Sequence, residues 1–451
     1  MFTSIHFKAL KDHLLTRNGE EEAALVVAGQ NETSQRIALL AREVIPIPPG
    51  GFSHKGQITL TIDPEFMMPI VKRCRLDKFS LILAHSHPFQ HYDTSFSSID
   101  DRGERVLMPK LQERIPDRHH ASLVMGQTSL DARIWMNGKD ISEPIDLVRV
   151  VGERLEEIPV NQHSSMNAQI AETHHRQVLA IGKDAQSHIQ QLRVAVVGVG
   201  GIGSQVFQLL CHLGVRHLAV IDYDVLEESN LSRIVGASHK DVGTPKVEVA
   251  KELAHRINAS IDVKAINGSV YDLKIAMQLR DLDVIFCCTD TLTSRVVLNR
   301  IAFQYLIPVV DTGVDIQCGD IGKIRTAAGR IMTILPDRPC LECTGFIDSA
   351  ALQEEAAMIE SGKVPKHGYV KGASTRVPSV ISLNAVVAGL AVTELIDLLS
   401  GLEVHKDPQT YKFYRITSGT VQLYRMQVEK RCTLCEEILA MGDRVRLPCR
   451  S

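Results

Sequence analysis

The chain has 451 residues, and its 50 Lys and Arg residues almost balance its 53 Asp and Glu residues. This near-balance gives no electrostatic reason to expect nucleic acid or an acidic membrane as the main partner. Apolar residues make up 44% of the chain, which argues against a disordered protein, and the length predicts two or three domains.

The start of the chain lacks a basic segment followed by an apolar one, so no signal peptide is expected. No run of about 18 consecutive apolar residues occurs, so no transmembrane helix is expected either. We therefore predict a cytoplasmic protein with no membrane partner. In that reducing compartment, ten cysteines indicate metal ligands or buried apolar residues before disulfides.

Residues 1–155 are predicted to form an α+β domain. Short apolar runs rich in β-branched residues predict strands, and one longer stretch predicts a helix. The strands are expected at residues 23–28, 56–62, 80–84 and 121–125, and the helix at residues 64–75. A polar stretch follows, and we assign residues 156–175 as a linker.

Two histidines, His85 and His87, come directly after the third of these strands, and Asp100 follows shortly afterwards. Alternate residues after a strand point to the same side, so the two imidazoles can bind one ion. With Asp100 they provide three zinc ligands and leave a position open for water. This arrangement is typical of catalytic zinc sites.

The motifs HSHP and SSID, with the upstream strand EAALVVAG, resemble the signature of JAMM metalloproteases of the Mov34/MPN type over about residues 10–140. The resemblance implies that the two histidines and the aspartate bind Zn²⁺. It also implies that Glu22 is the general base for the bound water and that Ser97 stabilises the oxyanion. The neighbouring Glu20 and Glu21 are less favoured as the base.

The spacer between His87 and Ser97 is somewhat longer than the JAMM family usually has. It would reshape the substrate groove or displace Asp100 from the site. His91, within this spacer, is expected to be a surface residue and not a ligand.

A different pattern begins at Arg193. Continuous β-branched runs alternate with longer helical segments, which predicts βαβ units, a mostly parallel sheet and an α/β class for the chain. We assign residues 176–451 to this Rossmann-like second domain. Its strands are expected at residues 194–197, 218–221, 284–287 and 307–310, its helices include residues 204–213 and 246–257, and a hairpin covers residues 411–426.

A glycine-rich loop follows the first strand of the second domain and opens a helix. Its glycines let backbone N–H groups approach a phosphate at the helix N-terminus. Asp222 ends the next strand, where a carboxylate can bind a ribose hydroxyl. This fingerprint alone fits an NAD(P)-dependent oxidoreductase equally well. The four glycines of the loop are Gly198, Gly200, Gly201 and Gly203.

Further polar residues are not accounted for by an oxidoreductase. Asn230 and Arg233 lie in the motif NLSR, Lys246 follows a Gly-Thr-Pro turn, and Asp290 follows the strand VIFC. With the glycine loop they resemble the ThiF/MoeB/HesA branch of the ubiquitin-activating, adenylating enzymes over about residues 173–440. The resemblance implies that Asn230, Arg233 and Lys246 bind the triphosphate of ATP. It implies that Asp222 binds the ribose and Asp290 binds Mg²⁺.

The same resemblance assigns Arg176 as the arginine that one subunit inserts into the site of its partner, which implies a homodimer. Attack of a carboxylate on the α-phosphorus builds up negative charge. Lysine, arginine and a metal ion are suited to stabilise that charge.

Two CxxC pairs have the spacing of zinc knuckles and together can complete a closed, structural tetrathiolate site. Two unrelated buried or redox-active pairs are the alternative. Many relatives in the resembling family carry a nucleophilic cysteine between the first knuckle and the late helix, but residues 344–375 contain none. Either the enzyme stops at the acyl-adenylate, or a cysteine elsewhere or on a partner protein accepts the acyl group. The knuckle residues are Cys340, Cys343, Cys432 and Cys435.

The two motif sets on one chain predict a bifunctional enzyme that uses ATP, Mg²⁺ and two Zn²⁺ ions. Its first domain would trim residues after the C-terminal diglycine of a ubiquitin-like or sulfur-carrier protein, or release that protein from a target. Its second domain would adenylate the exposed carboxylate. Three alternatives stay open at this point: adenylation of a peptide or small-molecule carboxylate beside a non-catalytic first domain, an oxidoreductase, and a scaffold.

Overall fold

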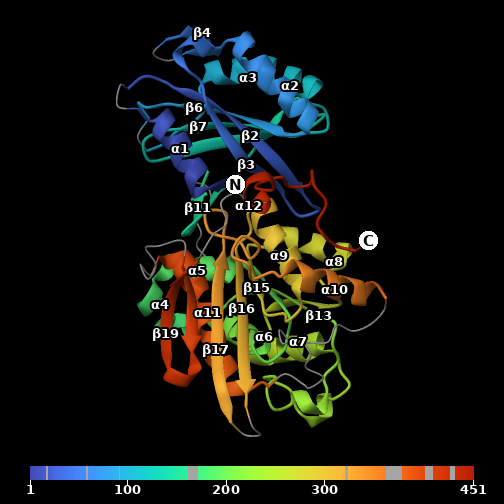
Figure 1. The fold of residues 1–451 in the computed structure, drawn as a ribbon. Helices are drawn as coiled ribbons and strands as arrows, with labels where there is room; N and C mark the ends of the chain where they lie inside the picture. The colour runs from blue at the N-terminus through green and yellow to red at the C-terminus, as the bar shows by residue number, and fades with distance from the viewer. Residues whose placement is uncertain are drawn as a thin grey trace. The chain divides into compact units, whose positions relative to one another are not determined.

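A computed structural model gives the fold (Figure 1). The structure describes residues 1–16, 19–56, 59–90, 92–160, 171–319, 323–361, 378–401, 410–426 and 432–450. His91 and half of the predicted linker, residues 161–170, lie outside these residues. The chain forms two compact units. The first unit comprises Met1–Ser165, Gln304–Leu306 and Leu439–Arg446, and the second comprises Met166–Phe303, Ile307–Ile438 and Leu447–Ser451.

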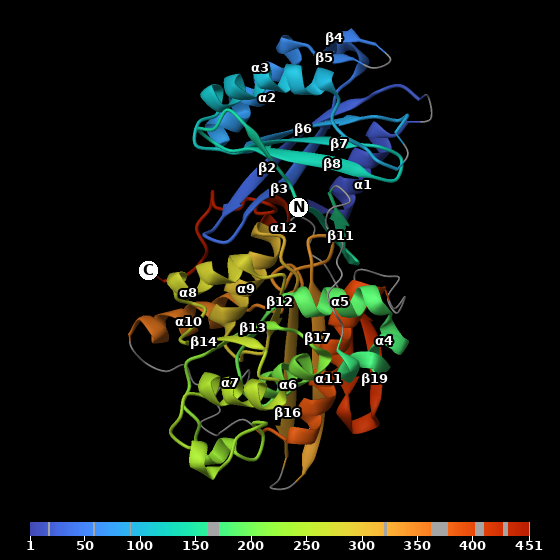
Figure 2. The same cartoon turned by 180° about the vertical axis from the view of Figure 1, so that it is seen from behind.

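A six-stranded sheet in the order β3-β2-β6-β7-β8-β9 forms the centre of the first unit. Its strand β2 is buried on both faces, because alternate residues such as Val26 and Leu25 contribute to two separate apolar clusters. Helix α1 packs on one face, and α2 and α3 cover the other (Figure 2). The bounds are β2 (Ala23–Glu32), β3 (Ile37–Pro46), β6 (Ser80–Ser86), β7 (His120–Met125), β8 (Leu130–Trp135), β9 (Ser142–Pro144), α1 (Ser4–Leu14), α2 (Pro64–Asp77) and α3 (Ser98–Arg114).

Two small sheets complete the first unit. One has the order β1-β10-β11, and the other pairs β4 with β5 as a hairpin. The hairpin is the part of this unit that carries Lys55, a residue of the candidate site below. The bounds are β1 (Phe2–Thr3), β4 (Phe52–Lys55), β5 (Leu60–Ile62), β10 (Leu147–Val151) and β11 (Leu155–Pro159).

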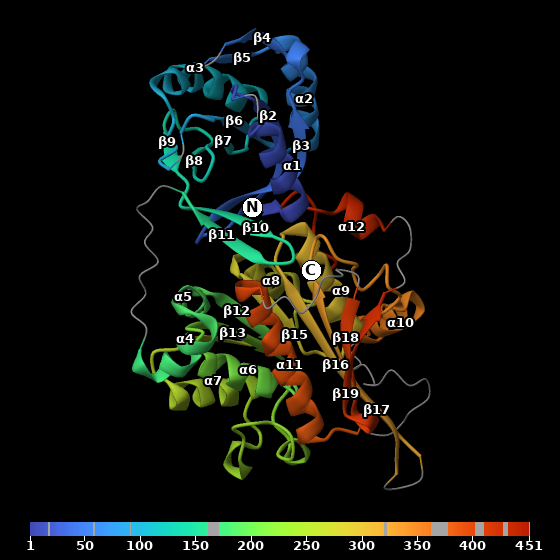
Figure 3. The same ribbon diagram turned by 90° about the vertical axis from the view of Figure 1, so that its left-hand side faces the viewer.

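The second unit contains an eight-stranded sheet in the order β14-β13-β12-β15-β16-β17-β18-β19. The strands from β14 to β16 are parallel, and the later pairs are antiparallel (Figure 3). The strand order reverses between β12 and β15, and such a switch point opens a crevice at the carboxyl ends of the strands. The bounds are β12 (Arg193–Val197), β13 (His217–Asp222), β14 (Asp262–Asn267), β15 (Val284–Cys287), β16 (Val309–Cys318), β17 (Ile324–Ile334), β18 (Thr410–Arg415) and β19 (Thr420–Arg425).

Nine α-helices belong to the described part of the second unit. One of them, α11, is long and apolar enough to cross a membrane by length and composition, a test that core helices also pass. Its buried residues pack against α6, β16 and β17. The bounds are α4 (His175–Ile181), α5 (Lys183–Gln191), α6 (Gly203–Leu213), α7 (Lys246–Ile257), α8 (Leu273–Ala276), α9 (Leu292–Gln304), α10 (Ser349–Glu360), α11 (Ile381–Ser400) and α12 (Thr433–Glu437).

The strands and helices expected from the sequence are present, and in two cases the element begins two or more residues later than expected. The strand expected at residues 307–310 begins at Val309, because Leu306 has a positive φ of 56° and Pro308 follows it. The strand expected at residues 56–62 covers only Leu60–Ile62. The segment Leu439–Arg446 groups with the first unit although it is distant in sequence, a connection that no sequence pattern indicated.

Candidate functional site

The glycine-rich loop joins β12 to α6 in the second unit. Gly198 has a φ of +88°, which favours glycine. A Cβ on Gly203 would lie 1.8 Å from the Gly198 carbonyl oxygen, and a Cβ on Gly201 would lie 2.3 Å from Asn384 Nδ2. Three of the four predicted glycines are therefore required by the tight packing of the loop, while a Cβ on Gly200 would meet no atom within 4 Å.

Asp222 connects this loop to the end of β13. Its Oδ2 accepts a hydrogen bond of 2.6 Å from Val199 N, and its Oδ1 accepts one of 2.8 Å from Asp224 N. Burial raises the pKa of Asp222, although Lys246 and these N–H donors oppose the shift. Since a carboxylate has further lone pairs, Asp222 can still accept a hydrogen bond from a ribose hydroxyl.

The residues predicted to bind the triphosphate gather after β13. Asn230 is buried in a short 3₁₀ turn, and Arg233 Nη1 donates a hydrogen bond of 2.8 Å to the Ser229 carbonyl oxygen. Lys246 begins α7, and its Nζ donates a hydrogen bond of 2.5 Å to Asp224 Oδ2. The other N–H donors of this lysine can bind a phosphate that enters.

Asp290 is exposed and lies between β15 and α9. Partial burial and the carboxylates of Asp224, Asp290, Asp222 and Glu355 together raise the pKa of Tyr223. Several carboxylates are therefore close enough to Tyr223 to affect its pKa. One or two carboxylates completed by phosphate oxygens form the usual protein environment of Mg²⁺, so the donor set fits this ion.

Arg176, the residue predicted to reach a partner subunit, is exposed on α4. It extends from a short helix that has no buried residue. The structure contains a single chain, so the predicted homodimer stays a prediction.

The four knuckle cysteines come together in the second unit, with all their Sγ atoms within 4.8 Å of one another. Cys340 Sγ lies 3.5 Å from Cys432 Sγ, near the separation of about 3.8 Å that tetrahedral Zn–S bonds require. Hydrogen bonds from Cys340 and Cys435 lower the pKa of Cys343. Four closely spaced thiols of this kind fit one zinc ion and leave no open position.

The ThiF family model matches residues 174–436, which are more than half of the chain. The chain belongs to the ThiF family. The match includes the glycine loop, the polar residues after β13 and all four knuckle cysteines. ATP and Mg²⁺ are the expected ligands of the ThiF crevice.

Curated relatives agree with the family. The ThiF region is 33% identical over 163 residues to the SAMP-activating enzyme E1 of Haloferax volcanii, covering 36% of this chain and 57% of that protein. It is 27% identical over 266 residues to the molybdopterin-synthase adenylyltransferase of Escherichia coli, covering 58% of this chain and 95% of that protein. The chain thus spans only about half the length of the first relative.

A crystal structure of E. coli MccB with AMPCPP and selenomethionine MccA has a TM-score of 0.46 and 19% identity. The similarity covers 60% of this chain and 76% of that one. At this level it adds nothing to the family assignment.

A second cluster of metal-ligating side chains lies in the first unit, where β6 ends and α3 begins. His85 Nε2 is 3.3 Å from Asp100 Oδ1, and His87 Nε2 is 3.5 Å from Asp100 Oδ2. Tetrahedral zinc with bonds of about 2.0 Å sets its ligand atoms about 3.3 Å apart, so these three residues fit zinc. The longer spacer has not displaced Asp100.

The N-terminus of α3 holds Asp100 in this position. Ser97 is the N-cap, and its Oγ accepts hydrogen bonds of 3.2 Å from Ile99 N and Asp100 N, while Asp100 Oδ2 accepts one of 2.6 Å from Ser97 N. Burial would raise the pKa of Asp100, but hydrogen bonds from His85, His87 and Ser97 lower it. These hydrogen bonds favour the ionised carboxylate, the form that binds zinc.

The glutamate beside these histidines is Glu21. Its Oε1 lies 3.8 Å from His87 Nε2, whereas Glu22 Oε1 accepts a hydrogen bond of 2.6 Å from Lys55. The reason is the register of β2 with β6. Ala23 pairs with His85, so the next positions set Glu22 opposite Ser86 and Glu21 opposite His87. The sequence favoured Glu22 over Glu21 as the base, but Glu21 is the glutamate that lies beside His87.

Sequence reasoning also missed Gln90, whose Oε1 lies 3.2 Å from His87 Nδ1. A hydrogen bond at that nitrogen fixes the ring and leaves Nε2 for a metal. Burial would lower the pKa of His87, but Asp100, Gln90 and Glu21 raise it. No local motif marks Gln90, because only the fold of the loop brings it to the histidine.

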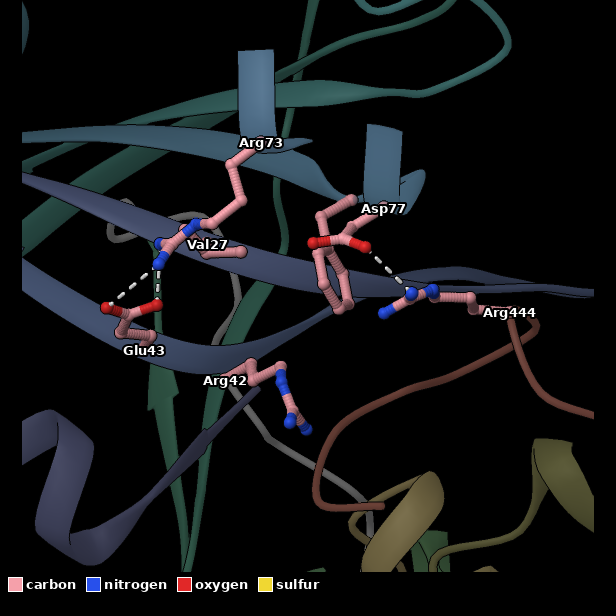
Figure 4. Close-up of a pocket in the computed structure, with 7 residues that line it drawn as sticks. Val27, Arg42, Glu43, Arg73, Asp77 and Arg444 are labelled. Carbon is pink, nitrogen blue, oxygen red and sulfur yellow. Dashed lines mark hydrogen bonds and ion pairs between the residues drawn. The ribbon is translucent and has the colours of Figure 1, made fainter. Parts of the chain in front are cut away.

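A small cavity of about 240 Å³ lies elsewhere in the first unit (Figure 4). Arg73 pairs with Glu43 at 2.6 Å, and Arg444 pairs with Asp77 at 3.0 Å. The first pair joins α2 to β3 and the second joins the returning C-terminal segment to α2, so the cavity is a structural junction. Its lining residues, none of which belongs to either predicted site, are Val27, Arg42, Glu43, Arg73, Asp77, Phe79 and Arg444.

Proposed function

We propose that the ThiF region uses ATP to adenylate the C-terminal carboxylate of a ubiquitin-like or sulfur-carrier protein. The observation that carries this proposal is the grouping of the glycine loop, Asp222 and Lys246 at the switch point of a ThiF-family sheet. The relatives above, which include an adenylyltransferase and an activating enzyme, support this class of substrate.

Each residue of the site has a separate role in the proposed adenylation. Backbone N–H groups of the glycine loop bind phosphate, and Asp222 binds the ribose. A carboxylate oxygen of the substrate attacks the α-phosphorus, the bond from that phosphorus to the bridging oxygen breaks, and pyrophosphate leaves. Asn230, Arg233 and Lys246 hold the triphosphate and stabilise the developing charge. Asp290 would hold Mg²⁺, which supplies further charge neutralisation when bound.

Arg176 would come from a second copy of the chain, so the active form in this proposal is a homodimer. The four cysteines would hold one structural Zn²⁺. We place the protein in the cytoplasm, where thiols stay reduced.

The first unit would act as a zinc-dependent peptidase on the same substrate class. His85, His87 and Asp100 would hold a Zn²⁺ ion, which activates a water molecule when bound. Glu21 is positioned to accept the proton of that water, and Glu22 is the alternative base that the sequence favoured. Ser97 retains its hydroxyl hydrogen for an oxyanion while its oxygen caps α3.

Together, the two activities would remove residues after a C-terminal diglycine and then activate the new carboxylate. The test incubates the full chain with candidate carrier proteins, with and without C-terminal extensions, in the presence of ATP and Mg²⁺. Intact masses should show loss of the extension and gain of an adenylyl group. Adenylation of short peptides or small acids, with no reaction of any carrier protein, would contradict the proposal.

A further inference from the structure

Helix α10 follows the first zinc knuckle and is held to the second unit in an unusual way. None of its residues from Ser349 to Glu360 is buried, so apolar packing contributes little to its position. Its carboxylate Glu355 instead binds the N-terminus of α9. Glu355 Oε2 accepts a hydrogen bond of 3.0 Å from Leu292 N, and Oε1 accepts one of 2.8 Å from Thr293 N.

These bonds replace the hydrogen bonds that an N-cap residue would accept, and the acceptor comes from another helix. The first N–H groups of a helix have no partner within it, and the residue just before the helix normally supplies one. Here Thr291 donates its hydroxyl hydrogen to Ser294 Oγ at 2.7 Å, and the acceptor is Glu355, more than 60 residues later in the chain. Thr293 Oγ1 adds a third bond of 2.6 Å to Glu355 Oε1.

The capped turn is continuous with the segment that carries Asp290. Thr289 and Thr291 flank this aspartate, and their hydroxyls lie 3.1 Å apart while Thr291 N donates to Thr289 Oγ1 at 3.3 Å. The segment is thus fixed by the threonines on both sides and by Glu355 where it enters α9. Release of Glu355 would leave the first N–H groups of α9 open to water and loosen the segment from that end.

We propose that Glu355 is a positioning residue for the adenylation reaction. It holds the Asp290 segment in the conformation that binds Mg²⁺, so docking of α10 and binding of magnesium are linked. This inference rests on the proposed adenylation, but part of its test does not. By linkage, any event that pulls α10 from α9 weakens magnesium binding, and magnesium binding in turn stabilises docked α10.

The first measurement is hydrogen exchange on the full chain without nucleotide. In Glu355→Ala, the amides of Leu292 and Thr293 should exchange about tenfold faster or more, because their charged acceptor is gone. Glu355→Gln keeps one acceptor oxygen and should give an intermediate rate. Glu354→Ala, an exposed residue of the same helix, is the matched control and should exchange like the unmodified chain.

The second measurement is equilibrium binding of a non-hydrolysable ATP analogue at increasing Mg²⁺. The Mg²⁺ concentration for half-saturation should rise about tenfold in Glu355→Ala, less in Glu355→Gln and not in Glu354→Ala. Equal Mg²⁺ dependence in all four proteins would overturn the inference. If the unmodified chain binds no nucleotide, the proposed function fails, and unchanged exchange at α9 in Glu355→Ala would then overturn the inference separately.

Discussion

Lys246 and Asp224 form a direct ion pair, with Nζ and Oδ2 2.5 Å apart at the start of α7. The lysine is largely buried, and this contact uses one of its three N–H donors, which leaves the others for phosphate. The pair therefore keeps a buried cation compensated until nucleotide arrives, since an unpaired buried charge is costly.

We expect Lys246→Ala to lower the rate of ATP–pyrophosphate exchange by about 100-fold or more, as for the loss of other groups that stabilise transition-state charge. Asp224→Asn should cost less than about tenfold, because the lysine that stabilises the transition-state charge remains. Lys240→Ala, at an exposed position, is the control. If Asp224→Asn lowered the exchange rate as much as Lys246→Ala does, Asp224 would act on the metal or substrate directly.

The position of Glu21 beside His87 leads to a second prediction. In a cleavage assay with a carrier protein that bears a C-terminal extension, Glu21→Gln should lower the rate by about 10²–10⁴-fold, which is the usual contribution of a general base. Glu22→Gln should have a smaller effect, through loss of the negative charge that pairs with Lys55. Zinc content should stay constant in both variants. If Glu22→Gln lowered the cleavage rate more than Glu21→Gln does, Glu22 would be the base.

The parts of the fold that could be predicted are those with a strong local signal. The βαβ segment from Arg193 has continuous apolar strands and amphipathic helices, and α7 begins and ends at the predicted residues. The glycine loop was equally visible, because its spacing follows from the backbone conformation that phosphate binding needs. A motif formed by neighbouring residues can be recognised from the sequence without knowledge of the fold.

Features that depend on strand register or on distant segments could not be predicted. Glu21 and Glu22 are adjacent in sequence, and only the pairing of Ala23 with His85 decides which one faces the histidines. Glu355 reaches α9 across more than 60 residues. The C-terminal segment likewise joins the first unit through Asp443, whose Oδ2 accepts a hydrogen bond of 2.8 Å from Glu32 N. None of these contacts has a local pattern.

The two metal clusters should be separable by zinc counting. We expect two zinc ions per chain by native mass spectrometry, one after His85→Ala and one after Cys343→Ser. The two variants should differ in stability, because a closed tetrathiolate site contributes directly to folding, whereas a catalytic site with an open position contributes less. Cys343→Ser should therefore lower the unfolding temperature of the second unit. Cys211→Ser, at a buried cysteine outside the cluster, should leave the zinc count at two.

Buried His120 makes the first unit sensitive to acid. Its Nδ1 accepts a hydrogen bond of 3.1 Å from Leu81 N, and burial lowers its pKa to about 4. In the unfolded chain the imidazole has a pKa of about 6.5 and binds a proton more readily than in the folded one. The folded state is therefore fully favoured above about pH 6.5, and stability is lost as the pH falls from there towards 4.

At pH 5 this difference should cost about 2 kcal/mol relative to pH 7.5, and the loss should level off at about 3 kcal/mol below pH 4. Urea unfolding of the first-unit transition at several pH values measures it. His120→Gln removes the titrating group and should flatten the slope between pH 4 and 6.5, even if it lowers stability throughout. His239→Gln, at an exposed histidine, should keep the slope. An unchanged slope in His120→Gln would assign the acid sensitivity to other groups.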